Sequence, residues 1–142
     1  MAPTGGKRLL QKIHHLGYAV EDLEAASRLY RERFGARIEE PEMVADQGVR
    51  TAMFRVGEAR IELLEPTGPD TPVGKFLANR GEGLHHVAFQ VEDIEATLGE
   101  LGRDGVELID EEPRVGAGGT RMAFVHPRSV HGVLTELVEP QD

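Results

Sequence analysis

The chain has 142 residues, enough for one domain or for two small modules that share a core. It contains no cysteine, so disulfides and thiolate metal sites are excluded and a cytoplasmic location is expected. Its formal net charge of −9 disfavours nucleic acid and anionic membranes as partners. The sequence contains no run of 18 apolar residues, so no membrane span is predicted. Residues 1–11 are expected to form a flexible N-terminal tail.

One segment of the sequence occurs twice. The twelve residues that begin at His14 match the twelve that begin at His85, in the frame His-His-apolar-small-aromatic-x-Val-Glu-Asp-apolar-Glu-Ala. The two copies lie half a chain apart. A match of this length indicates a duplicated supersecondary unit, so we expect two halves with the same order of elements.

In the first half, a strand that contains His15 is followed by a helix after Asp22, where an N-cap is wanted. The helix is expected to end at Gly35. Three strand-like runs then cover residues 36–40, 49–56 and 59–65, and Gly57 and Glu58 form a hairpin turn between the last two.

A connection rich in proline and glycine, residues 66–72, separates the halves and leads into a short helix at about 73–79. In the second half, the strand that contains His86 is followed by a helix after Asp93 that ends at Gly102 or Gly105. Strand-like runs follow at residues 106–110, 120–125 and 132–138.

These elements predict an α+β fold in which two tandem βαβββ modules form a curved mixed sheet around a metal cleft. We expect one domain over residues 12–142, built from a repeat at 12–66, a linker at 67–83 and a second repeat at 84–139.

Side-chain alternation assigns a face to each residue of the first strand of each repeat. The bulky residues share one face, which suits packing against a helix. His15 lies on the other face beside Gly17, and His86 lies beside Ala88, so each histidine has small neighbours that leave room for a ligand. By the same alternation His14 and His85 are expected to point to the opposite face.

The last strand of each repeat carries a glutamate, Glu62 or Glu136, inside an apolar run. A carboxylate in such a strand is costly unless it is paired or binds a metal. Each residue has a simpler interpretation on its own, a hydrogen-bonding histidine or a solvent-facing glutamate. Because both types recur at corresponding places, we predict that His15, Glu62, His86 and Glu136 bind one divalent ion. Glu65 and Glu139 are interpreted as surface charges at strand ends.

From residue 13 to residue 139 the chain resembles the vicinal oxygen chelate, or glyoxalase-like, superfamily, and within it the methylmalonyl-CoA epimerase family. The motifs GEGLHH and EPRVGAGG and the ending HP…GVLTEL are the most specific part of this resemblance. The stretches that carry it are residues 13–17, 46–49, 61–66, 81–86, 112–119, 124–127 and 132–137.

The resemblance implies an isomerase that interconverts (2R)- and (2S)-methylmalonyl-CoA by removing and returning the C2 proton through a metal-stabilised enolate. It also implies an acyl-CoA substrate, one divalent ion per subunit and a homodimer. Cobalt is the favoured metal, with zinc, manganese or nickel as alternatives. Lys75, Arg114, Arg121 and Arg128 are candidates for contacts with the CoA phosphates.

The chain departs from one version of the family pattern at Thr51, where some members carry a glutamate proposed as a base. A threonine hydroxyl is not a base at neutral pH without activation. Glu136 resembles the metal-bound glutamate to which the family assigns the opposite catalytic role. Asp46, Glu42 or a metal-bound water are candidates for the other side.

Two other functions fit the same scaffold, because a fold does not fix a function. A glyoxalase I-type isomerase would use the same four ligands and similar proton transfers. A small-molecule-binding protein without catalytic activity would not need the complete His/Glu/His/Glu set, so this set favours an enzyme.

Overall fold

The structure, a computed structural model, describes residues 8–141. The predicted tail falls mostly on residues 1–7, outside the described part. Gln11, at the end of the predicted tail, donates its backbone N–H to the carbonyl of Gln90 at 2.9 Å. None of the helices in the described residues is long and apolar enough to cross a membrane.

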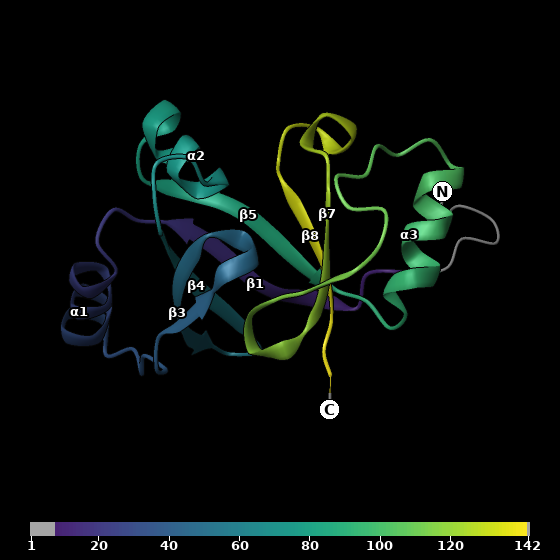
Figure 1. The fold of residues 1–142 in the computed structure, drawn as a ribbon. Coiled ribbons are helices and arrows are strands. Elements are labelled where there is room, and N and C mark those ends of the chain that lie inside the picture. The colour runs from purple at the N-terminus through teal and green to yellow at the C-terminus, as the bar shows by residue number, and fades with distance from the viewer. Residues whose placement is uncertain (1–7, 142) are drawn as a thin grey trace.

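The described residues form one mixed sheet of eight strands with three α-helices (Figure 1). The strands follow the order β2-β3-β4-β1-β5-β8-β7-β6, so each half of the chain supplies four adjacent strands. Their bounds in that order are Glu42–Val44, Val49–Val56, Ala59–Pro66, Lys12–Ala19, Gly83–Gln90, Thr135–Glu139, Arg121–Val125 and Arg114–Val115. The predicted α+β fold of two βαβββ modules is confirmed.

The two modules join within one chain, because β1 pairs antiparallel with β5. Inside each module the first strand pairs parallel with the last, β1 with β4 and β5 with β8. The centre of the sheet therefore consists of the strands that carry the four predicted ligands.

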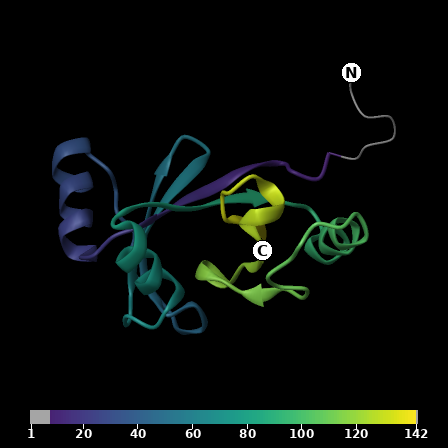
Figure 2. The same cartoon turned by 90° about the horizontal axis from the view of Figure 1, so that it is seen from above.

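Helices α1 (Leu23–Phe34) and α3 (Ile94–Arg103) lie at opposite ends of the molecule, as Figure 2 shows from above. Both begin as predicted, since the side chains of Asp22 and Asp93 accept backbone N–H groups at 3.1 and 3.0 Å. α1 ends at Gly35, whose left-handed φ of 69° suits glycine.

Glu65 and Glu139 are not the surface charges expected from the sequence. Each is partly buried and accepts the first backbone N–H of a helix, from Leu23 in one repeat and from Ile94 in the other, both at 3.0 Å. A negative charge at a helix N-terminus is stabilising. These acids therefore fasten each helix to the end of the last strand of its module.

Two predicted strands are wrong. Residues 36–40 form no strand, because Ala36 and Ile38 pack against α1 and its neighbours, and the short edge strand begins only at Glu42. Residues 106–110 make one isolated bridge, between Leu108 and Val125, while the edge strand lies at Arg114–Val115. In both places apolar alternation serves the core rather than a sheet ladder.

The two faces of the sheet have different partners. α1 packs over Ala52, Phe54 and Leu63, and α3 packs over Val125 and Leu137. The residues that alternate with these, such as Leu64 and Val138, face the inside of the sheet. There α2 (Pro72–Arg80) covers one end with Val73.

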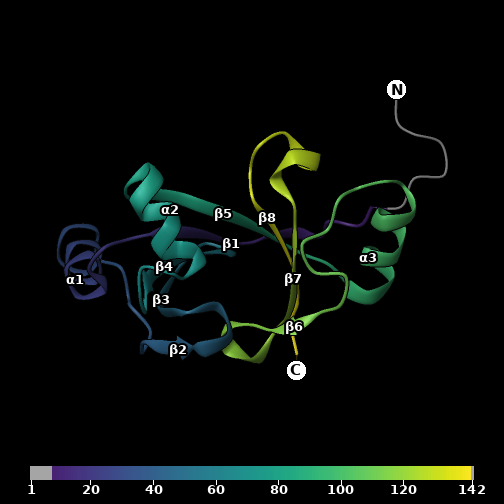
Figure 3. The same ribbon diagram turned by 45° about the horizontal axis from the view of Figure 1, so that its top comes forward.

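The sheet curls so that its outer strands approach each other (Figure 3). Ala117, in the 3₁₀ turn η2 (Ala117–Gly119), packs against the core cluster that contains Val44 of β2. The carboxylate of Glu42 accepts the backbone N–H of Gly118 at 3.0 Å. These contacts link the two modules a second time, on the far side of the inner face.

Candidate metal centre

The four predicted ligands come from four adjacent strands, and sheet register brings them together. Between β1 and β5, His86 lies opposite Gly17 and His15 lies opposite Ala88. The same small residues are the register partners of the two acids, Gly17 of Glu62 and Ala88 of Glu136. Each histidine therefore lies opposite a small residue, and an acid lies on the other side of that small residue, in agreement with an approximate two-fold symmetry between the modules.

Donor atoms of His15, His86 and Glu136 form one tight group, and Glu62 lies close to the two histidines of that group. The Nε2 atoms of His15 and His86 are 3.1 Å apart. Glu136 Oε1 lies 3.2 Å from His15 Nε2 and 2.9 Å from His86 Nε2. Glu62 Oε1 lies 3.3 and 3.7 Å from the same two nitrogens.

Four of these five separations fit the coordination of a single divalent ion, and the fifth, 3.7 Å between Glu62 Oε1 and His86 Nε2, is slightly longer. Donors at 2.0–2.2 Å from one ion are roughly 2.8–3.6 Å apart in octahedral or tetrahedral geometry. One atom each of His15, His86 and Glu136 lie within 4.8 Å of one another, and Glu62 reaches the same two imidazoles. Two imidazoles and two carboxylates also suit Zn²⁺, Co²⁺, Ni²⁺ and Mn²⁺. The residues present therefore fit the group that the sequence predicts.

The four side chains are buried, and burial strengthens the electrostatic attraction between their carboxylates and a cation. The four residues are 2–5% exposed. Burial lowers the pKa of His15, but hydrogen bonds with Glu136 and Glu62 outweigh it and raise the pKa to about 10. Burial raises the pKa of Glu136, but hydrogen bonds with His15 and His86 hold it well below its ordinary value. Two buried carboxylates thus create a field that favours positive charge between the imidazoles.

The prediction that His14 and His85 point to the opposite face is wrong. The ladder between β1 and β5 skips both residues, with register shifts between Ile13 and His15 and between Gly17 and Tyr18. A β-bulge of this kind interrupts the alternation of faces. Each outer histidine therefore lies beside the inner one, with Nδ1–Nδ1 distances of 2.8 Å for His14–His15 and 2.9 Å for His85–His86.

The electrostatics of the outer histidines differ from those of the inner pair. Burial, followed by the charge of His15 and then that of Arg60, lowers the pKa of His14 to about 4. Burial and the charge of His86 lower the pKa of His85 to about 4 as well. The outer rings are therefore neutral hydrogen-bond partners at ordinary pH.

A cavity of about 180 Å³ opens beside His86 on the inner face. Asp46 and Gln47, from the 3₁₀ turn η1 (Ala45–Gln47), line one side, and the N-terminal end of α2 adds Pro72 and Val73. Its other lining residues are Val49, Leu64, His85, Ile109, Arg114, Phe124 and Leu134. It is a largely apolar chamber with a few polar groups, as expected of a ligand site.

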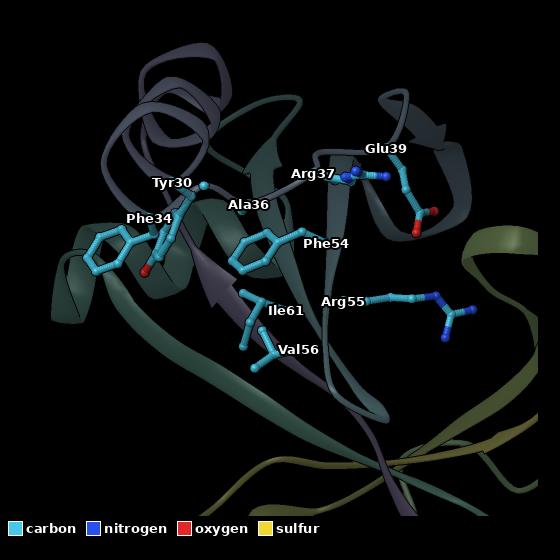
Figure 4. A pocket seen from close by; sticks show the side chains of 10 residues that line it. Tyr30, Phe34, Ala36, Arg37, Glu39, Phe54, Arg55, Val56 and Ile61 are labelled. Carbon is cyan, nitrogen blue, oxygen red and sulfur yellow. The ribbon is translucent and has the colours of Figure 1, made fainter.

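A larger hollow of about 760 Å³ lies on the other face of the sheet, between α1 and strands β3 and β4 (Figure 4). Tyr30, Phe34 and Phe54 supply much of its wall. Ile61 also lines it, and alternation along β4 turns Ile61 away from the side that carries Glu62. No histidine is among the described residues that line it, so the donor cluster identifies the smaller cavity as the candidate site.

The other candidate residues from the sequence differ in whether they reach the cavity. Asp46 lines the cavity, whereas the carboxylate of Glu42 is engaged by Gly118. Thr51 is buried in β3, 3% exposed. Arg121 pairs with Glu95 and Glu139, and Arg128 pairs with Glu107.

Of the four basic candidates, Arg114 alone lines the cavity. Its Nε lies 3.1 Å from Asp110 Oδ1, and Asp110 Oδ2 accepts the backbone N–H of Phe124 at 2.9 Å. Asp110, which is not among the residues predicted from the sequence, thus links the guanidinium to β7. Only the four-residue spacing of an acid and an arginine signals this pair in the sequence.

Sequence comparison with known proteins shows which family the chain belongs to. Residues 14–124 match the profile of the glyoxalase/bleomycin resistance protein/dioxygenase superfamily. The mitochondrial methylmalonyl-CoA epimerase of Dictyostelium discoideum is 37% identical over 135 residues, which cover 94% of this chain and 81% of the relative. The chain belongs to this superfamily and, within it, to the methylmalonyl-CoA epimerase family.

Two solved structures share the fold at similar identity. One is a Streptomyces coelicolor methylmalonyl-CoA epimerase variant in complex with 2-nitronate-propionyl-CoA, 42% identical with a TM-score of 0.90, covering 94% of this chain and 99% of the other. The second is a methylmalonyl-CoA epimerase in complex with methylmalonyl-CoA and NH₄⁺, 43% identical with a TM-score of 0.88, covering 92% and 94% of the two chains. The recognition of the family from the sequence is confirmed.

Proposed function

We propose that this chain is an epimerase that interconverts (2R)- and (2S)-methylmalonyl-CoA at a divalent metal ion held by His15, Glu62, His86 and Glu136. The observation that carries the proposal is the convergence of four buried donors beside a cavity of about 180 Å³. Relatives at 37–43% identity bear this enzyme's name, and one of them binds methylmalonyl-CoA.

The bound ion would supply a Lewis acid that stabilises the negative charge developing on substrate oxygen as the C2 proton leaves. We propose Co²⁺ as the native ion, since the family resemblance favours it. Zn²⁺, Mn²⁺ and Ni²⁺ share the preference for these donors. Metal analysis of the purified protein by mass spectrometry identifies the ion.

We assign one acid/base role to Glu136. Glu136 Oε1 lies close to both imidazoles. The second carboxylate oxygen, Oε2, has its own lone pairs and can accept a proton. That second oxygen can take the C2 proton from one face of the substrate and return it.

Epimerisation also requires a group on the opposite face, and we propose Asp46 for it. Among the residues that line the cavity, Asp46 is the carboxylate, and it comes from η1 rather than from a strand. Glu42 is less suited because the N–H of Gly118 engages its carboxylate. Thr51 has no basic group, so we expect no proton transfer from it.

The size of the cavity indicates how the substrate binds. Sites that enclose a drug-sized ligand measure about 300–1,000 Å³, so about 180 Å³ suits the acyl head group and leaves the rest of CoA outside. The acyl head carries a carboxylate, and Arg114 is the arginine on the cavity wall. We propose that the Arg114 guanidinium pairs with that carboxylate, since such pairs are strong and directional.

The proposal is tested by deuterium incorporation at C2 of methylmalonyl-CoA in D₂O, with and without a chelator. We expect rapid incorporation that the chelator abolishes and the ion restores. Glu136→Gln and His86→Ala should lose metal and exchange together, while His131→Ala, an exposed residue, should leave both unchanged. Turnover of the methylglyoxal–glutathione hemithioacetal alone would indicate a glyoxalase I-type isomerase instead.

Two further outcomes bear on the alternatives. Binding of acyl-CoA without a stoichiometric divalent ion and without exchange would indicate a binding protein. We also propose that the chain assembles as a homodimer, because the family resemblance implies one. The molar mass measured by light scattering during size-exclusion chromatography tests this, and a mass near 15.6 kDa would contradict it.

A further inference from the structure

Each inner histidine of the candidate metal centre is backed by the histidine that precedes it in the sequence. The Nδ1 atoms are 2.8 Å apart in the His14–His15 doublet and 2.9 Å apart in the His85–His86 doublet. Both doublets have the same cause, a β-bulge at the outer histidine. The arrangement thus occurs in both modules with nearly the same geometry.

The hydrogen bond at Nδ1 decides what Nε2 can do. A neutral imidazole carries one N–H and one lone pair, on different nitrogens. His15 and His86 direct Nε2 toward each other and toward Glu136. A metal bond from Nε2 therefore requires the proton on Nδ1. Among residues 8–141, the hydrogen-bond partner of each inner Nδ1 is the outer histidine.

We propose that His14 and His85 are positioning residues: each accepts the Nδ1–H of its inner neighbour through its own Nδ1 and thereby holds the Nε2 lone pair toward the metal. The inference rests on the proposed metal centre and adds to it the groups that fix the tautomer and the ring orientation of two ligands. Ligand histidines in metal sites commonly donate their second N–H to such a partner.

The burial of the two doublets supports this role. His14 is 7% exposed, so solvent has little access to replace it as an acceptor. His85 is held by an edge contact with Phe76, with ring centroids 5.0 Å apart. The His85 ring cannot turn away without losing this contact, and burial restricts the His14 ring, so both acceptor atoms stay behind the ligands.

The test compares variants at residue 14 that keep or remove the acceptor. In His14→Asn the amide oxygen can accept the Nδ1–H of His15, whereas His14→Leu fills similar space without an acceptor. The affinity of the full-length, metal-free protein for Zn²⁺ is measured at one pH by competition with a chromophoric chelator. We expect His14→Leu to bind about 10- to 100-fold more weakly than the wild type and His14→Asn to stay within about threefold. The pair His85→Leu and His85→Asn should behave in the same way.

A second measurement separates positioning from packing. Long-range ¹H–¹⁵N spectra of the imidazoles in the zinc-loaded protein report which nitrogen of His15 carries the proton. We expect a protected Nδ1–H in the wild type and in His14→Asn, and loss of its protection in His14→Leu. Equal affinities for the Leu and Asn variants, or an unchanged Nδ1–H in His14→Leu, would overturn the inference. If the wild type binds no zinc, the proposed metal centre itself fails, which the wild-type titration alone reveals.

Discussion

Gly17 of β1 lies opposite His86 of β5, and the imidazole of His86 occupies the space that a side chain at Gly17 would fill. A Cβ added at Gly17 would collide with Cε1, Nδ1 and Nε2 of that ring. The collision would involve an imidazole fixed on one side by His85 and on the other by Glu136. A glycine is therefore needed at position 17 to make room for the His86 imidazole, and not to form a turn.

Gly17→Ala should displace the His86 imidazole and weaken Zn²⁺ or Co²⁺ binding by about tenfold or more, the size of effect seen when the support of a ligand is removed. Ala88→Gly is the matched control, because Ala88 lies opposite His15 in the other module. It should lower the free energy of unfolding by about 1 kcal/mol without changing metal affinity more than about twofold. Chelator competition and thermal unfolding measure both quantities. Unchanged affinity in Gly17→Ala would show that His86 is not a ligand.

The convergence of the four predicted ligands could be predicted from the sequence because two simple regularities hold. The duplicated segment fixed which residues correspond, and strand alternation put His15 and Glu62 on the same face. The parallel pairing of the first and last strands of each module then brings histidine and glutamate into contact. Neither step needs knowledge of side-chain packing.

The placement of His14 and His85 could not be predicted in this way, because alternation assumes an uninterrupted ladder. A bulge at each doublet breaks that assumption, and a bulge depends on the register of the opposing strand. The missed strand positions near Ile38 and Leu108 have a related cause. Their apolar side chains pack against helices, and a pattern of apolar residues does not tell which partner covers them.

Asp46→Asn should slow epimerisation by about 10²-fold or more, the usual contribution of a positioned acid/base group. The two epimers should respond differently in D₂O. If Asp46 serves one face and Glu136 the other, the variant should retain C2 exchange from one epimer and lose it from the other. Glu42→Gln and Thr51→Val are the controls, and each should stay within about threefold of the wild type. Wild-type epimerisation by Asp46→Asn would exclude Asp46 and leave the second proton source to solvent.

Arg114→Gln should weaken binding of methylmalonyl-CoA by roughly 10- to 100-fold, because a charge-assisted hydrogen bond contributes about 1.5–3 kcal/mol. Propionyl-CoA lacks the carboxylate, so its affinity should change little. Arg121→Gln is the control, since Arg121 is paired with Glu95 away from the cavity lining. Calorimetry on metal-loaded protein gives the dissociation constants. An equal loss for both acyl-CoAs would indicate that Arg114 contacts the CoA phosphates instead.

Metal affinity should rise with pH between about 6 and 9. In the metal-free protein, burial lowers the pKa of His15, but hydrogen bonds with Glu136 and Glu62 raise it to about 10. His15 is therefore an imidazolium, protonated on both ring nitrogens, throughout this range. An ion that binds Nε2 must displace the proton on that nitrogen. One displaced proton gives about a tenfold rise in apparent affinity per pH unit. Titrations in buffers of different ionisation enthalpy count the protons released. A pH-independent affinity over this range would contradict the assignment of His15.

Arg60→Met should strengthen metal binding, in contrast to every other substitution considered at the site. When His14 accepts the Nδ1–H of His15, its own proton lies on Nε2, and Arg60 Nη1 is 3.5 Å from that atom. Two donors then face each other, which disfavours the arrangement that leaves His15 Nε2 free for the ion. Removing the guanidinium removes the repulsion between the two donors, and methionine replaces the apolar part of the arginine side chain. We expect a gain of about three- to tenfold in Zn²⁺ affinity, comparable to one hydrogen bond.

The control for this gain is Arg55→Met, because Arg55 is the register partner of Arg60 across the β3–β4 hairpin. It removes the same charge from the same hairpin, so any general electrostatic effect on cation binding appears equally in both variants. The difference between the two affinities isolates the contact with His14. A gain of the same size in both would assign the effect to net charge, and a loss in Arg60→Met would show that His14 receives a hydrogen bond at Nε2 and donates at Nδ1.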